Sequence, residues 1–244
     1  MSESYGALLP ALFDGAATFG WRAGMNGVIQ TLLGDCDGPM LELGCGRGDL
    51  LAALAAAGAT GPVVGIELHP EAFATTRAAD VHFVRSDAHR LPCASASAAT
   101  ILALDLLDQR GLEPAVVLGE CRRVLQPGGR LIVRVSAYPW LYGPHDVAFN
   151  TARRFRRSEL SDLLQKAGFG ITRMTYADSL LIGPVMGLRL LQRWGVVSFD
   201  ASLYRAHWSN GLIARTLNLE ARFLARWNLP SGLSLLAVAQ KVGD

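Results

Sequence analysis

A glycine-rich stretch between a strand-like and a helix-like segment constrains the fold of this chain more than any other feature. It reads LELGCGRGDLL over residues 41–51. The apolar Met40–Leu43 predicts a buried strand, and Asp49–Ala57 predicts a helix whose leucines share one face. Glycines at the junction permit left-handed backbone and close approach of a ligand, and the free N–H groups of the helix N-terminus favour an anion. We therefore expect a ligand-binding loop here.

The spacing of the glycines excludes one familiar type of loop. Gly44, Gly46 and Gly48 form G-x-G-x-G, whereas the dinucleotide fingerprint G-x-G-x-x-G requires glycine at the position of Asp49. The loop therefore argues against a nicotinamide-dependent dehydrogenase.

Beyond the loop, strand-like and helix-like segments alternate. The expected strands are Val63–Glu67, Val81–Val84, Thr100–Leu104, Arg130–Val135, Ile171–Tyr176 and Ser234–Lys241. The expected helices are Glu71–Ala79, Pro114–Leu125, and one that Ser158 caps and Gly168 ends. Such alternation implies right-handed βαβ units and a parallel sheet, which binds its ligands beyond the carboxyl ends of the strands.

We expect one domain over residues 1–244, with two helical additions to this sheet. The first is an N-terminal helical segment over residues 1–38. The second is an insertion over residues 177–232, with helices around Gly187–Val196 and Ser209–Trp227. It is too long for a simple connection between strands. It can be a cap packed on the core, a substrate lid or a membrane-contacting patch, and these roles can coexist.

Two acidic residues stand where a nucleoside ligand requires them. Glu67 ends the second strand about 20 residues after the glycine loop, where a carboxylate accepts hydrogen bonds from ribose hydroxyls. Asp87 follows the third strand, where it can accept from an adenine amino group. Each acid alone could be a solvated loop residue, but the loop and both acids in this order favour a nucleoside site.

These motifs resemble the class I S-adenosylmethionine (SAM)-dependent methyltransferase superfamily. The resemblance covers Met40–Phe169 and includes LELGCGRGDL, the strand end at Glu67, SDAHRLP at Ser86–Pro92 and RRVLQPGGRLIV at Arg122–Val133. It implies an α/β, Rossmann-like seven-stranded sheet of order 3-2-1-4-5-7-6, with the seventh strand antiparallel and helices on both faces.

The same resemblance assigns the donor site. It implies that SAM is the cofactor, with S-adenosylhomocysteine as the product. Glu42, Gly44, Gly46 and Gly48 would shape the donor loop, and Cys45 would contribute only its backbone. Glu67 would bind the ribose, and Asp87 with Ala88 the adenine.

A narrower likeness, to a group of bacterial methyltransferases, covers the rest of the chain. It rests on the segments AYPWL (137–141), HDV (145–147), RRFR (153–156), SEL (158–160) and LPSGLSLL (229–236). The chain departs from that group where an acid–histidine pair is frequent, because it carries Asp108-Gln109. A frequent histidine before the arginine pair is also missing near Thr151, so roles carried by those histidines are not transferred.

The acceptor side is less determined by the sequence. His145, beside Asp146, is our candidate general base because histidine titrates near neutrality; alternatively, the pair shapes its loop by hydrogen bonds. Asp105 and Asp108 follow the fourth strand, where one of them can contact the methionine part of SAM or cap the loop.

Aromatic and basic residues complete the candidate acceptor site. Tyr138, Trp140 and Tyr142 can form an apolar wall or pack in the core. Arg153 and Arg154 can attract a phosphate- or carboxylate-bearing acceptor or an anionic membrane surface, or they can belong to a solvated or salt-bridged surface. We find no compact cluster of metal ligands, and we expect no metal.

Composition narrows the function classes. The formal charge of +2 and the lack of an added RNA-binding module argue against nucleic acid as the substrate. No signal peptide or stretch of ~20 apolar residues is visible, and no CxxC pair occurs, so we expect a cytoplasmic protein. We expect methyl transfer to a small-molecule, glycan or lipid-linked acceptor, with peripheral membrane contact and homodimerisation left open. The alternative is a non-catalytic subunit that binds a protein partner through its helical insertion.

Overall fold

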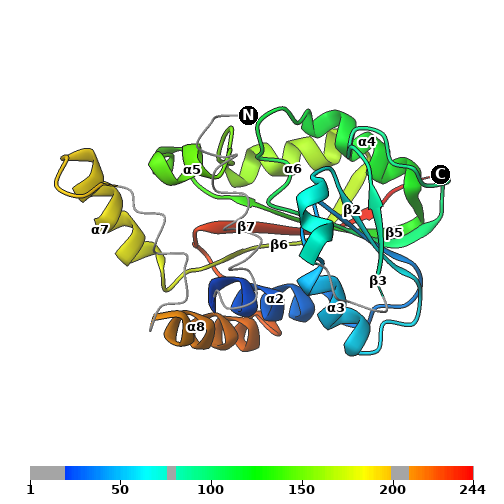
Figure 1. The fold of residues 1–244 in the computed structure, drawn as a ribbon, viewed down its shortest axis with the longest axis horizontal. Coiled ribbons are helices and arrows are strands. Elements are labelled where there is room, and N and C mark those ends of the chain that lie inside the picture. Colours follow the sequence, from blue (N-terminus) through cyan, green and yellow to red (C-terminus); the bar gives the residue numbers. More distant parts are fainter. Residues whose placement is uncertain (1–19, 76–80, 199–208, 244) are drawn as a thin grey trace.

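The computed structural model of the chain describes residues 20–75, 81–198 and 209–243. Its centre is one seven-stranded mixed sheet of order β3-β2-β1-β4-β5-β7-β6, as predicted (Figure 1). The strands are β1 (Met40–Leu43), β2 (Val63–Glu67), β3 (Val81–Arg85), β4 (Ala98–Leu104), β5 (Leu125–Ser136), β6 (Phe169–Ala177) and β7 (Ser234–Lys241). Strands β1 to β5 pair in parallel, whereas β7 runs antiparallel to both β5 and β6.

Helices cover both faces of this sheet. On one face lie α2 (Gly20–Leu33), α3 (Asp49–Ala56) and α8 (Ser209–Leu224), and on the other lie α4 (Pro114–Val124), α5 (Pro144–Ala148) and α6 (Arg157–Lys166). Short 3₁₀ turns occur at Pro70–Thr75 and Pro139–Leu141. Helix α7 (Ile182–Arg193) stands beyond the edge of the layers, at the end of β6 (Figure 1).

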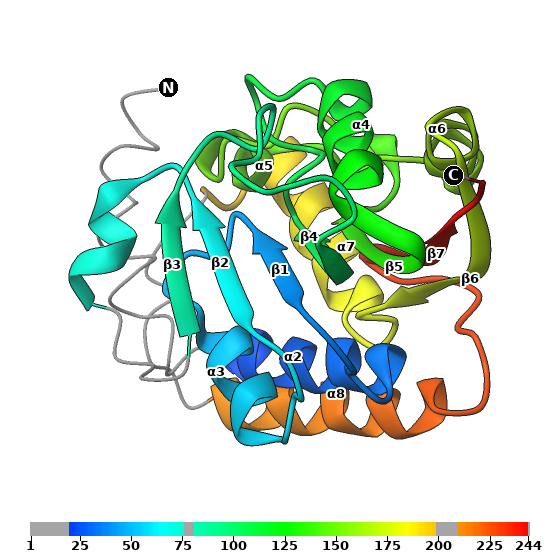
Figure 2. The ribbon, with the colours of Figure 1, turned by 90° about the vertical axis from the view of Figure 1, so that its right-hand side faces the viewer.

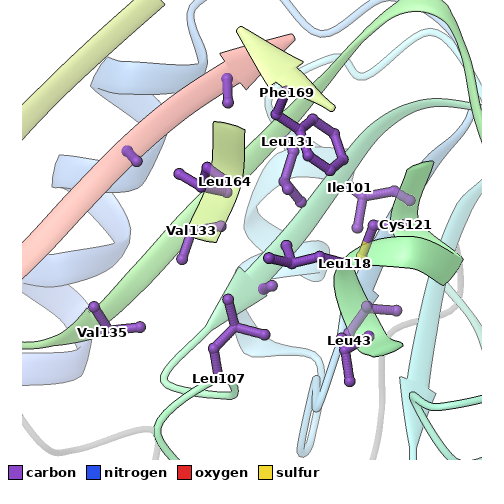
Figure 3. Close-up of a cluster of buried hydrophobic side chains, with 14 of the residues drawn as sticks. Leu43, Ile101, Leu107, Leu118, Cys121, Leu131, Val133, Val135, Leu164 and Phe169 are labelled. Carbon is purple, nitrogen blue, oxygen red and sulfur yellow. The ribbon is translucent and has the colours of Figure 1, made fainter. Parts of the chain in front are cut away.

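The two layers of helices follow from the alternation of side chains along the strands. Ile101 and Ala103 of β4 belong to the core under α4 and α6, whereas Leu102 between them belongs to the core under α2, α3 and α8. Successive strand residues point to opposite faces, so an uninterrupted apolar strand supplies both cores. Figure 3 shows the first core, where Leu118 of α4 and Leu164 of α6 gather with the side chains of the central strands.

The helical insertion contributes to the second core through α8. Helix α8 packs along α2, and the contact needs residues without side chains: a Cβ on Gly24 would lie 2.5 Å from Leu217 Cβ. Leu217 and Leu224 are fully buried, and Ala221 nearly so. The C-terminal half of the insertion is therefore part of the packed body, as the cap reading describes, and it fixes the position of α2.

Some predicted boundaries are wrong. Ser158 does not cap α6, which begins at Arg157; instead, Glu159 Oε2 accepts the backbone N–H of Arg156 at 2.7 Å. Strand β5 begins five residues earlier than predicted, because the chain rejoins the sheet as soon as α4 ends at Val124. The helix predicted over residues 71–79 begins as a 3₁₀ turn, and its last residues lie outside the described part, as do residues 1–19 of the N-terminal segment.

No helix in the described ranges combines the length and the apolar character that crossing a membrane requires.

Candidate donor and acceptor site

The register of the parallel strands brings the predicted donor residues to one edge of the sheet. Leu43 at the end of β1 pairs with Ile66 of β2 and with Ala103 of β4. Glu67 pairs with Arg85 of β3. The segments that follow these strands therefore begin side by side, as the parallel arrows of β1, β2 and β3 show (Figure 2).

The glycine loop has the backbone conformation that its sequence predicts. Gly44, Gly46 and Gly48 have φ of 69°, 54° and 75°, in the left-handed region that residues with side chains disfavour. The Gly44 N–H donates to Ile66 O at 2.8 Å, and Gly48 stands at the N-cap of α3. A Cβ on Gly48 would lie 2.5 Å from the Phe83 ring. The loop therefore needs glycine at this position for both conformation and space.

Glu67 joins the glycine loop to the end of β2. Its Oε2 accepts the backbone N–H of Gly46 at 2.9 Å, and its Oε1 accepts those of Leu68 and His69 at 2.8 and 2.9 Å. The side chain is buried, with 7% exposure. Each carboxylate oxygen can accept more than one hydrogen bond, so this arrangement fixes the acid without exhausting its acceptors.

Asp87 stands one strand further along the edge, with His89 against it. Asp87 Oδ1 accepts from the backbone N–H of His89 at 2.9 Å and lies 2.7 Å from His89 Nδ1. Because His89 Nε2 accepts the N–H of Glu113 at 3.0 Å, we assign the ring proton to Nδ1, which donates to Asp87. The backbone hydrogen bond from His89 lowers the pKa of Asp87, which keeps it ionised and able to accept. Ala88 beside it is buried.

Glu42 lies in the sheet directly before the glycine loop. It is 6% exposed, and its Oε2 accepts no hydrogen bond from the described residues. Burial raises the pKa of Glu42 to about 8, although the nearby guanidinium groups of Arg134 and Arg22 oppose the shift. At neutral pH this carboxyl is therefore mainly protonated.

The two acids after β4 form contacts with the side chains and backbone of β5. Asp105 forms a bidentate ion pair with Arg134 of β5, at 2.8 Å from Nε and 2.5 Å from Nη2. Asp108 is buried, and its Oδ2 accepts the N–H of Ser136 at 2.9 Å. Burial, and then the charge of Asp105, raises the pKa of Asp108 to about 6. Both acids thus join the ends of β4 and β5.

Two residues that accompany these acids, Arg134 and Trp21, are not predicted from the sequence. Arg134 interrupts the apolar run of β5, and its guanidinium lies 4.9 Å from the centre of the Trp21 ring on α2. The indole N–H of Trp21 donates to buried Asp178 at 2.7 Å. A charged residue within a buried strand was the available signal for Arg134, since such a residue requires a partner. The sequence carries no comparable signal for the place of Trp21.

His145 and Asp146 lie in the first turn of α5, in the segment that follows β5, and they have different surroundings. Asp146 is buried: Oδ2 accepts the Gly143 N–H at 2.8 Å, and Oδ1 accepts Arg154 Nε at 2.8 Å. His145 is half-buried and stacks on Phe149, with ring centres 4.5 Å apart. Burial lowers the pKa of His145 to about 4, so the ring is neutral at pH 7 and is a weak base.

Of the aromatic and basic residues predicted for the acceptor site, some are accessible, and others form hydrogen bonds within the segment that follows β5. Tyr138 stacks on Tyr176 at 5.5 Å and lies 5.8 Å from Trp140, which is 51% exposed. Tyr142 donates to Thr151 O at 3.0 Å. Arg154 is buried, and besides Asp146 it donates to Ala137 O at 3.0 Å. Arg153 is exposed and covers the Phe155 ring at 4.3 Å. The accessible candidates are therefore Trp140 and Arg153.

Comparison with known proteins finds a family whose model matches part of this chain. Residues 41–133, which hold the glycine loop, Glu67, Asp87 and Asp105, match the model of a family described as a methyltransferase domain. An uncharacterised 37.1 kDa protein of transposon Tn4556 from Streptomyces fradiae is 37% identical over 99 residues. These residues are 38% of this chain and 28% of that protein, so the chain spans only a minor part of its relative.

Solved structures share the fold at low sequence identity. One is from the Haloferax volcanii complex between the Trm112 methyltransferase activator and a proposed methyltransferase, with a TM-score of 0.66 and 18% identity, covering 100% of this chain and 99% of that one. Another is phosphoethanolamine N-methyltransferase 2 of Haemonchus contortus in complex with SAM, with a TM-score of 0.61 and 15% identity, covering 90% of this chain and 52% of that one.

Proposed function

We propose that the chain is a class I SAM-dependent methyltransferase, which transfers the methyl group of SAM to a small-molecule, glycan or lipid-linked acceptor in the cytoplasm. The observation that carries the proposal is the junction of β1 and β2, where Glu67 holds the N–H of Gly46 inside a loop of three left-handed glycines. A carboxylate beside the backbone N–H groups of a helix N-terminus is the arrangement that would suit the ribose and the carboxylate of SAM.

We propose that SAM lies along the carboxyl edge of the sheet. Glu67 would accept from the ribose hydroxyls, and Asp87 with Ala88 would bind the adenine. The methionine part would lie by Gly44–Gly48 and Glu42, with Asp105 at its margin. Its ammonium group would favour ionised Glu42, which the protein alone keeps mainly protonated. His89 would keep Asp87 oriented for the adenine.

For the acceptor we propose the space in front of the loop that follows β5. Methyl transfer from a sulfonium is an in-line displacement, which needs alignment and exclusion of water more than it needs chemical groups. Trp140 is accessible there, and Arg153 can attract an anionic acceptor. Since the pKa of His145 is about 4, the site suits an acceptor that is already ionised or that loses its proton readily.

Calorimetric titration tests the donor site. The purified chain is titrated with SAM and separately with NAD, and the titrations are repeated on Glu67→Ala and on Glu71→Ala, an exposed acid four residues away. We expect SAM binding in the wild type and in Glu71→Ala, a large loss in Glu67→Ala, and no NAD binding. A folded wild-type sample that does not bind SAM would refute the proposal.

A second candidate function is a non-catalytic subunit that binds a protein partner. It is supported by the fold shared with the chain from the Trm112 complex. Incubating the chain with methyl-labelled SAM and pools of candidate acceptors distinguishes the enzyme from the non-catalytic subunit. Label transferred by the wild type and lost in Glu67→Ala favours the enzyme, whereas SAM binding without transfer to any acceptor favours the subunit.

A further inference from the structure

Helix α7 is not packed like the other long helices of the described chain. None of its twelve residues is buried, whereas α2, α4 and α6 each bury an apolar row. Figure 1 shows α7 beyond the edge of the helical layers, away from the two cores. A helix with few polar residues that packs on no core of the described residues leaves its apolar side chains available to a partner.

The apolar side chains of this region are large and strongly exposed. We define the α7 surface as Leu180, Met186, Leu190, Leu191, Trp194 and Val196, which are 59%, 37%, 45%, 38%, 72% and 66% exposed. Trp194 directly follows the helix and is the most exposed large apolar residue recorded among the described residues. An exposed tryptophan beside leucines is typical of a segment that lies in a membrane interface.

The charges around this surface have one sign. Between residues 180 and 198 the charged residues are Arg189 and Arg193, and no acid occurs. In the described part of the insertion, the acids are Asp178 and Glu220, which are 1% and 5% exposed. Arg193 is exposed, whereas the Arg189 side chain is only 12% exposed and lies toward Asp146. The charge that this apolar surface offers is therefore positive, which is complementary to an anionic partner and not to a second copy of itself.

We infer that the α7 surface docks on an anionic phospholipid bilayer. A short helix of this kind lies in the plane of the interface, with its apolar side chains below the headgroups and the exposed Arg193 near the phosphates. Apolar burial would hold the helix in the bilayer, and the positive charge of Arg193 would add attraction to the negative surface.

Two arginine contacts connect this surface to α5 and to the turn that precedes it. Arg193 Nη2 donates to Trp140 O at 2.8 Å, and Arg189 Nη2 lies 3.8 Å from Asp146 Oδ2. A Cβ on Gly143 would lie 3.3 Å from Arg189 Nη1, so the helix and the loop are in contact. Docking would thus place the proposed acceptor space close to the bilayer. The consequence, that the acceptor is an amphiphile presented by the membrane, rests on the proposed methyl transfer.

Vesicle binding without SAM tests the docking directly. The full chain is sedimented with vesicles of phosphatidylglycerol and phosphatidylcholine, and with vesicles of phosphatidylcholine alone. We expect binding to the anionic vesicles that weakens with added salt. Leu190→Glu should lower the affinity by about tenfold or more, since it removes apolar burial and adds a repelled charge. The matched control is Val116→Glu on α4, where the valine is 43% exposed and the affinity should not change.

Tryptophan emission locates the contact. Anionic vesicles made with brominated lipid should quench the tryptophan emission of the wild type, and Trp194→Ala should remove most of that quenching. No binding to anionic vesicles, or binding that Leu190→Glu leaves unchanged, would overturn the inference. A dimer in solution that Leu190→Glu dissociates, without vesicle binding, would assign the surface to a second copy and overturn it too. SAM titration of the same samples reports on the donor site independently, so either proposal can fail alone.

Discussion

Replacing Gly48 by alanine tests whether the donor loop depends on glycine for both backbone and space. At φ of 75° a side chain costs about 1 kcal/mol in the left-handed region, partly offset by the lower entropy of the unfolded chain. The new Cβ would also lie 2.5 Å from Phe83 Cζ and 2.8 Å from Cε1. Relief of such a contact in a packed site costs about 1 to 3 kcal/mol. We expect Gly48→Ala to lower the free energy of unfolding by about 2 to 4 kcal/mol.

Gly58→Ala is the matched control. Gly58 also has a positive φ, of 97°, but a Cβ there would meet no atom within 4 Å. It should therefore show the backbone cost alone, about 1 kcal/mol. In the background Phe83→Leu, which removes the ring, Gly48→Ala should lose most of its additional cost, because the two residues are coupled by contact.

Urea denaturation and SAM titration of the four variants measure these effects. SAM affinity should fall in Gly48→Ala, since a shift of the α3 N-terminus moves the loop, and it should stay at the wild-type value in Gly58→Ala. Equal free energies of unfolding for Gly48→Ala and Gly58→Ala would refute the reasoning about space. An unchanged SAM affinity in Gly48→Ala would refute the link between this glycine and the donor.

Three further predictions concern titratable groups. Because burial raises the pKa of Glu42 to about 8, the folded state stays protonated while the unfolded state ionises, and stability is lost as pH rises from about 4.5 to 8. At pH 4, Glu42→Gln should therefore have the same melting temperature as the wild type, and at pH 9 its melting temperature should exceed that of the wild type. Thermal melts in which the variant melts below the wild type at pH 9 would contradict this. Asp105→Asn leaves the buried guanidinium of Arg134 without its ion pair and should lower the free energy of unfolding by about 2 kcal/mol, whereas no loss in urea denaturation would show that the pair contributes little. With a pKa of about 4, His145 should produce no inflection in the pH–rate profile between pH 5 and 8, and an inflection there that His145→Gln removes would contradict the neutral, half-buried ring.

The fold and the donor loop were predictable because their signals are local. Leu41–Leu43 and Gly44–Gly48 lie in one short segment, and glycine spacing reports directly on backbone conformation. The sheet order came from the resemblance, and the topology confirms it. Helix ends were less predictable, as α6 shows. Ser158 is able to cap a helix, but α6 begins one residue earlier, where Glu159 at the third helical position accepts the backbone N–H of Arg156.

The acceptor side was less predictable because it depends on contacts between distant segments. Asp146 and Arg154 were assigned to catalysis and to acceptor binding, yet each is buried and each is the other's partner. Arg134 and Trp21 are separated by more than a hundred residues, and only the packing of α2 along α8 brings the indole over the guanidinium. Sequence spacing carries no information on such contacts, which is why residue type alone did not predict the ion pair between Asp146 and Arg154.

A crystal structure of the chain with S-adenosylhomocysteine tests the central claim most directly. We expect the ribose hydroxyls within hydrogen-bonding distance of Glu67, the adenine amino group at Asp87, and the homocysteine part against Gly44–Gly48 with its sulfur facing the loop after β5. Density for the ligand elsewhere on the chain, or at this edge with Glu67 and Asp87 turned away from it, would contradict the assignment of the donor site.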